Sequence, residues 1–172
     1  MNLRDPAMRQ AIHQAAAPEH IEQARELCLE YAGWLKIDLC FQDFERELAQ
    51  LPGDYAPPGG RLLLAYRRTA NPEEVGPVGC VALRRFDPTT GEIKRLYVRP
   101  QARAEGTGRR LVAQVILAAR EIGYRRLVLD TLPQMTAARA LYASFGFREI
   151  PGYYANPLPG VIYLALDLPP VA

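Results

Sequence analysis

Residues 92–111, EIKRLYVRPQARAEGTGRRL, decide the fold of this 172-residue chain. They read as a strand that stops at Pro100, a basic turn with spaced glycines, and an amphipathic helix. The first N–H groups of a helix lack intrahelical partners, and the helix dipole adds partial positive charge there. Gly106 and Gly108 let a ligand approach the backbone closely. The turn therefore predicts a binding site for a phosphate or pyrophosphate group.

Two common phosphate-binding loops do not fit this turn. No Gly-Lys-Ser or Gly-Lys-Thr follows it, which excludes the nucleoside-triphosphate P-loop. Its glycine spacing differs from Gly-x-Gly-x-x-Gly, and no acidic residue ends a second strand at the distance that a dinucleotide-binding fold requires. The alternative is a glycine-rich turn that only begins a helix.

Two motifs resemble those of the GCN5-related N-acetyltransferase (GNAT) superfamily. Arg103-x-x-Gly106-x-Gly108 is similar to the Arg/Gln-x-x-Gly-x-Gly/Ala motif that binds acetyl-CoA in that family. The segment ARALYASFGF at 138–147 is similar to the family's Ala-x-x-Leu-Tyr-x-x-x-Gly-Phe. The resemblance covers residues 60–150 and implies an acetyl-CoA-dependent N-acetyltransferase that transfers acetyl directly to a primary amine of a small molecule or peptide.

Composition and charge narrow the class of protein. The length suits a single domain over residues 1–172, and 23% of the residues are charged. The net charge of +2 is too small to indicate a nucleic-acid partner or an anionic membrane, and no apolar run is long enough to cross a bilayer. Cys28, Cys40 and Cys80 form no metal-binding spacing, so we expect no metal. Their odd number and the lack of a signal peptide favour a cytoplasmic protein.

Hydrophobic periodicity predicts an α/β fold. We expect strands at 7–13, 61–67, 78–86, 92–98, 126–131, 147–150 and 161–168, and helices at 18–33, 41–51, 107–123 and 136–145. Residues 52–60, rich in proline and glycine, are expected to be an irregular loop. Strands 92–98 and 126–131 flank a helix and should therefore lie parallel. The predicted core is a mixed, mostly antiparallel central sheet flanked by helices, as in the GNAT fold.

The resemblance also implies where acetyl-CoA binds. In the family, the sheet is splayed between the strands that correspond to 92–98 and 126–131, and the pantetheine arm lies along the exposed edge of the first. Ala104 replaces a glycine that many relatives carry, which is tolerable if its φ is negative. An amide N–H near Leu96 would face the thioester carbonyl. The cofactor-binding residues implied are Leu96, Tyr97, Val98, Arg103, Ala104, Glu105, Gly106, Thr107, Gly108 and Arg109.

Two side chains are candidates for catalysis. By resemblance, Tyr142 is the general acid that protonates the departing CoA thiolate; the alternative is an aromatic that packs on the core. Glu92 matches the position where some histone-modifying relatives carry a base. Strand alternation puts it on one face with Lys94, Leu96 and Val98. The alternatives are an exposed turn residue at 92, Asp130 as the base, or ordered water.

Acceptor recognition is expected from aromatic residues outside the two motifs. Trp34 follows the first helix, and Tyr153 and Tyr154 lie in a proline-restricted loop at 151–160. The alternative for this loop is ordinary exposure or a contact in a homodimer. Met135 stands where relatives often carry an Asn that contacts the cofactor. This departure leaves a rival function, a non-catalytic acyl-CoA-binding regulator on the same fold; modification of a protein or tRNA is a second rival.

Overall fold

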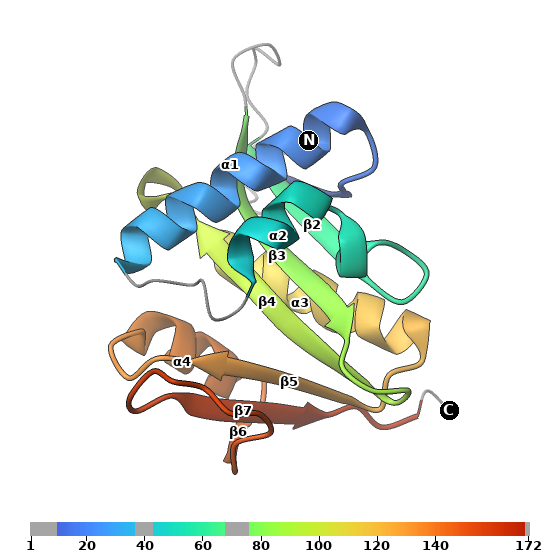
Figure 1. Cartoon of the computed structure of the whole chain (residues 1–172), viewed down its shortest axis with the longest axis vertical. Helices are drawn as coiled ribbons and strands as arrows, with labels where there is room; N and C mark the ends of the chain where they lie inside the picture. Colours follow the sequence, from blue (N-terminus) through green and yellow to red (C-terminus); the bar gives the residue numbers. More distant parts are fainter. Residues whose placement is uncertain (1–9, 37–42, 68–75, 171–172) are drawn as a thin grey trace, which may run out of the picture.

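The computed structural model describes residues 10–36, 43–67 and 76–170 (Figure 1). Its centre is one seven-stranded sheet with the order β1-β2-β3-β4-β5-β7-β6. The strands are β1 (Gln10–Gln14), β2 (Arg61–Arg67), β3 (Pro77–Arg85), β4 (Thr90–Val98), β5 (Arg126–Thr131), β6 (Arg148–Ile150) and β7 (Ile162–Asp167). The helices are α1 (Pro18–Leu35), α2 (Phe44–Gln50), α3 (Thr107–Ile122) and α4 (Thr136–Ser144), with short 3₁₀ turns η3 (Gly53–Tyr55) and η5 (Pro100–Ala102).

All neighbouring strands are antiparallel except β4 and β5, which are parallel as their crossover through α3 predicts. The parallel pairing begins at Thr90↔Arg126 and ends at Glu92↔Val128, although β4 continues to Val98 and β5 to Thr131. The two strands therefore diverge toward their carboxyl ends. The predicted mixed sheet, splayed between these strands, is confirmed.

Helices cover both faces of the sheet (Figure 1). We call the side covered by α1 and α2 the α1 face and the opposite side the α3 face. Leu27, Cys28 and Cys80 are buried in the core of the α1 face, where the two cysteines act as small apolar residues. The core of the α3 face includes five residues of α3: Leu111, Val112, Val115, Ile116 and Ala119.

Several expected boundaries need correction. Helix α1 passes through Gly33 and ends at Leu35, with Lys36 in the left-handed conformation as its cap. A single glycine weakens a helix by about 1 kcal/mol, which packing of the helix can outweigh. The segment 52–60, expected to be an irregular loop, contains the 3₁₀ turn η3, and the Tyr55 side chain of this turn is buried in the α1-face core. The expected strand residues 7–9 and helix residues 41 and 42 lie outside the described part of the chain.

A bulge in β4 overturns the predicted alternation. Cys80 pairs with Tyr97 and Ala82 with Lys94, so β4 contains one residue more than β3 between these pairs. Arg95 lies at this point with φ +58°. Beyond it the faces exchange: Leu96 and Val98 pack against the α3-face core with Ile93, whereas Tyr97 belongs to the α1-face core. Leu96 and Lys94 therefore lie on opposite faces, contrary to the prediction.

Candidate active site

The turn between β4 and α3 is tied together by its own side chains. Gly106 caps α3 with φ +75°, a left-handed conformation that glycine adopts readily. The Thr107 hydroxyl donates to the Ala102 carbonyl (3.1 Å), and Arg103 Nε donates to the Val98 carbonyl (2.9 Å). These bonds order the loop ahead of the helix, where the first N–H groups of α3 lack intrahelical acceptors. The loop is suited to hold an anion.

Ala104 departs from its expected conformation. Its φ is +64°, in the left-handed region, whereas tolerance of alanine here was predicted to rest on a negative φ. A Cβ in this region clashes with the following carbonyl, at about 1–2 kcal/mol per residue. The backbone of the loop thus keeps the conformation that suits glycine although alanine occupies the position.

A groove with a volume of about 520 Å³ runs past this loop. The carboxyl half of β4 and the first turns of α4 form its other walls. All the predicted cofactor-binding residues except Glu105 line it. Glu105 instead forms an ion pair with Arg67. The α4 side of the groove includes Met135, at the position where relatives often carry a cofactor-contacting Asn. The other residues that line this side are Gln134, Thr136, Ala137, Ala138 and Leu141.

Trp34 lines the same groove rather than lying beside Tyr153 and Tyr154, with which it was grouped as an acceptor contact. It reaches the loop from the end of α1, and the guanidinium of Arg103 lies over its ring, 4.8 Å from the centroid. The side chain is 46% exposed. Its position makes it a wall of the groove on the side opposite α4.

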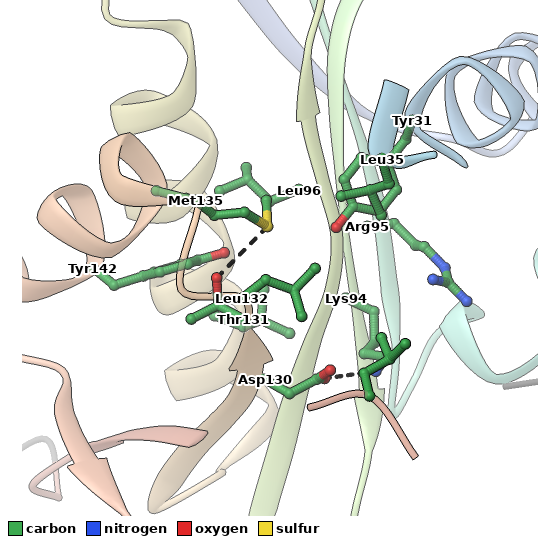
Figure 2. Close-up of a pocket in the computed structure, with 13 residues that line it drawn as sticks. Tyr31, Leu35, Lys94, Arg95, Leu96, Asp130, Thr131, Leu132, Met135 and Tyr142 are labelled. Atoms are coloured by element: carbon green, nitrogen blue, oxygen red, sulfur yellow. Dashed lines mark hydrogen bonds and ion pairs between the residues drawn. The ribbon is translucent and has the colours of Figure 1, made fainter. Parts of the chain in front are cut away.

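A second, smaller cavity of about 60 Å³ lies where β4 and β5 diverge (Figure 2). It shares Leu96, Met135 and Ala138 with the groove, so the two spaces meet at these residues. Figure 2 shows Met135 and Tyr142 on the α4 side of β4, and Tyr31 and Leu35 on the α1 side. The cavity is therefore lined by residues from both faces of the sheet.

Tyr142 reaches this cavity from α4. Its ring packs edge-on against Phe147, with 5.4 Å between ring centroids, and it is buried. Burial raises the pKa of the Tyr142 phenol far above its ordinary value, so the hydroxyl keeps its proton at neutral pH. A buried, protonated phenol at a cavity wall can donate a proton to a group bound there.

The α1 side of the cavity carries charge. Asp130 lines it and accepts hydrogen bonds from Lys94 Nζ (2.8 Å) and the Tyr154 hydroxyl (3.1 Å). Asn156 Nδ2 donates in turn to the Tyr154 oxygen (2.7 Å). Burial, followed by the negative charge of Asp130, raises the pKa of Tyr154. The loop at 151–160 thus contributes to the site by fixing one oxygen of the Asp130 carboxylate.

Glu92 is not an exposed turn residue, because its side chain is 2% exposed. It accepts hydrogen bonds from Arg84 Nε (2.7 Å) and the Tyr153 hydroxyl (2.9 Å), and Lys94 Nζ lies 3.7 Å away. It lies at the end of the β4–β5 pairing and lines neither the groove nor the cavity. Tyr153 therefore faces a carboxylate of its own chain.

Arg95 is neither a surface residue nor free to meet a substrate carboxylate, because its side chain is 3% exposed and forms an ion pair with Glu47. Within the described residues, no group of three His, Cys, Asp or Glu side chains is arranged to hold a metal ion. In that same part of the chain, every helix falls short of the length or apolarity needed to cross a membrane.

Comparison with known proteins places this architecture. Residues 10–147 match the acetyltransferase (GNAT) family. An uncharacterised N-acetyltransferase of Schizosaccharomyces pombe is 39% identical over 152 residues, which cover 88% of this chain and 90% of the relative. A GNAT-family acetyltransferase of Staphylococcus aureus has a similar fold, with a TM-score of 0.75 and 23% identity over 93% of this chain and 99% of its own.

A further similar structure contains a ligand. The GNAT-family acetyltransferase of Elizabethkingia anophelis was solved with acetyl-CoA bound; it is 25% identical, covers 93% of this chain and 99% of its own, and has a TM-score of 0.62. The chain therefore belongs to the acetyltransferase (GNAT) family, whose acetyltransferases use acetyl-CoA as the acetyl donor.

Proposed function

We propose that this chain transfers the acetyl group of acetyl-CoA directly to a primary amine of a small molecule or peptide. The observation that carries the proposal is the junction between the two spaces. The groove past the anion-binding loop meets the cavity of Asp130 and Tyr142 at Leu96, Met135 and Ala138. A thioester at this junction would be within reach of an acceptor from the α1 face and of Tyr142 from the α3 face.

The groove offers separate contacts for the two ends of the donor. The N–H groups of the loop and of the start of α3, with the charges of Arg103 and Arg109, suit the pyrophosphate. Leu96, Tyr97 and Val98 follow the last β4–β5 pair, and they line the groove. Their backbone groups would hold the pantetheine arm as a neighbouring strand would.

The chain's own residues supply the remaining chemistry. Bound acetyl-CoA provides an acyl carbon whose C–S bond breaks as a C–N bond to the amine forms. In the proposed arrangement, the Leu96 N–H donates to the carbonyl oxygen, where negative charge develops. Tyr142 donates its proton to the departing sulfur. The proposed transfer is direct, without an acetylated cysteine; the cysteines among the described residues, Cys28 and Cys80, line neither the groove nor the cavity.

Asp130 is better placed than Glu92 to take the proton from the attacking amine. Its carboxylate lines the cavity on the side from which the acceptor would enter. Both carboxylates are bound by a cation and a tyrosine, but Glu92 lies outside that lining. Its place at the cavity therefore favours Asp130 as the proton acceptor, and we propose that Glu92 holds Arg84 and the Tyr153 loop.

Mass spectrometry of a broad amine panel with acetyl-CoA tests the proposal. The panel contains amino acids, polyamines, aminoglycosides and short peptides. We expect an acetylated product whose formation falls about 100-fold or more in Asp130→Asn at neutral pH, the usual range for a general base. The matched change Glu92→Gln should lower kcat much less. No product with any amine would contradict the proposed function, and a larger loss of kcat in Glu92→Gln would assign the base to Glu92.

A further inference from the structure

The bulge in β4 has an unusual backbone at its centre. Arg95 has φ +58°, a conformation that side chains with a Cβ disfavour. The next residue is Leu96, whose backbone lies where groove and cavity meet. The left-handed residue reverses the faces on which the following strand residues lie: Leu96 packs against the α3-face core and Tyr97 belongs to the α1-face core, opposite to regular alternation. The direction of the Leu96 N–H therefore depends on the backbone at Arg95.

Two side chains hold the Arg95 guanidinium in place. Its Nε and a terminal nitrogen donate to the two carboxylate oxygens of Glu47 in α2, each at 2.8 Å. The Phe44 ring lies 4.9 Å from the guanidinium carbon. The side chain is 3% exposed and that of Glu47 14%. A planar fork matched to a carboxylate fixes orientation as well as distance, which makes the pair suited to restrain the backbone behind it.

A third contact holds the bulge from the backbone side. The buried Cys80 thiol in β3 donates to the Arg95 carbonyl, with 3.3 Å between sulfur and oxygen. The carbonyl and the side chain of Arg95 are thus both fixed, one by the neighbouring strand and the other by α2. Strained backbone conformations persist where the surroundings over-determine them, and they gather at active sites.

We infer that the Arg95–Glu47 ion pair is a positioning device that holds the β4 bulge so that the Leu96 N–H points at the reacting carbonyl. Arg95 lines the cavity, but its guanidinium points away from that space (Figure 2), so in this role both side chains act through the backbone at Leu96. The inference rests on the proposed function, since it needs a thioester at the junction. It extends the site to α2, which precedes both sequence motifs.

The competing explanation is that the ion pair only contributes to folding. Buried ion pairs are weak evidence for stability, because the loss of hydration offsets their attraction. A pair that serves folding alone would affect every assay in proportion to the folded fraction. A positioning pair would affect kcat while leaving acetyl-CoA binding at the loop largely intact.

The test compares two double variants that differ by one methyl group. Both contain Glu47→Gln, so that no carboxylate is left buried without its partner; one adds Arg95→Gly and the other Arg95→Ala. Both lack the ion pair, but glycine adopts the left-handed conformation freely and alanine does not. We expect kcat of the glycine variant to exceed that of the alanine variant about tenfold, with KM for acetyl-CoA within about threefold. Equal kcat values would overturn the inference.

Further measurements keep the test decisive. The single variant Glu47→Gln keeps the shape of the pair but loses the charge that strengthens its hydrogen bonds, so we expect its kcat to be severalfold lower than that of wild type. This measurement tests the inference also when the alanine variant does not fold. The control is Glu30→Gln. Glu30 forms an ion pair with Arg99, which follows β4, so this variant also removes a carboxylate from an ion pair, and it should keep wild-type kcat. Wild-type kcat in Glu47→Gln would overturn the inference. Failure of the proposed function would instead appear as wild-type enzyme without product.

Discussion

Replacing Ala104 by glycine should stabilise the protein, whereas most substitutions destabilise. Ala104 is exposed and has φ +64°, so its Cβ makes the conformation unfavourable without filling a core. Removing the Cβ relieves about 1–2 kcal/mol. The greater freedom of glycine in the unfolded chain offsets about 0.4–1 kcal/mol of this gain. With the middle of each range, the net increase in the free energy of unfolding is about 0.8 kcal/mol, which raises Tm by about 2–3 °C.

The matched control is Ala113→Gly in the interior of α3, where the same atoms are removed from a residue in a regular helix. Glycine there should lower the free energy of unfolding by about 0.5–1 kcal/mol. Differential scanning calorimetry of both variants measures the two shifts, which should have opposite signs. If Ala104→Gly lowers Tm as Ala113→Gly does, the left-handed conformation at Ala104 is not a source of strain and the reasoning fails.

Three further predictions follow from the contacts of single side chains. Tyr142→Phe should lower kcat about 100-fold or more while Tm and KM for acetyl-CoA change little, because the ring keeps its contact with Phe147; unchanged kcat would remove Tyr142 from the mechanism. Trp34 is the only tryptophan of the chain and lines the groove, so titration with acetyl-CoA should change the intrinsic fluorescence. If calorimetry shows that the protein is saturated and the emission spectrum is unaltered, the donor binds elsewhere. Burial raises the pKa of Tyr31 to about 12, so the folded protein keeps a proton that the unfolded chain loses near pH 10. The free energy of unfolding should therefore fall between pH 10 and 12, and Tyr31→Phe should weaken this fall; an equal fall in both proteins would exclude Tyr31 as its source.

Local sequence patterns predicted the elements that form the groove well. The turn after β4, the start of α3 at Thr107 and the parallel pairing of β4 with β5 all depend on residues close in the sequence. Glycine placement and helical periodicity report such features directly. The groove accordingly gathers the predicted loop residues, apart from Glu105, whose side chain pairs with Arg67.

The bulge and the charged network depend on contacts between distant residues. Arg95 takes its left-handed conformation in a strand whose local pattern indicates regular alternation, and its partner Glu47 lies 48 residues earlier. Tyr153 binds Glu92 across 61 residues. Neither pairing leaves a periodic signal in the sequence. The same holds for Trp34, whose place beside Arg103 follows from the length and direction of α1.

In the proposed arrangement, the cavity lined from both faces of the sheet explains why the motifs identify the donor but not the acceptor. The donor side is built from β4, the loop before α3 and α4, which contain both motifs. The acceptor side is built from Tyr31 and Leu35 of α1 and from Leu158 of the final loop, all outside the motifs. Asp130 and Lys94, which form an ion pair, carry charge from the sheet to that side. Acceptor choice can therefore change through α1 and the final loop without altering the machinery that binds acetyl-CoA.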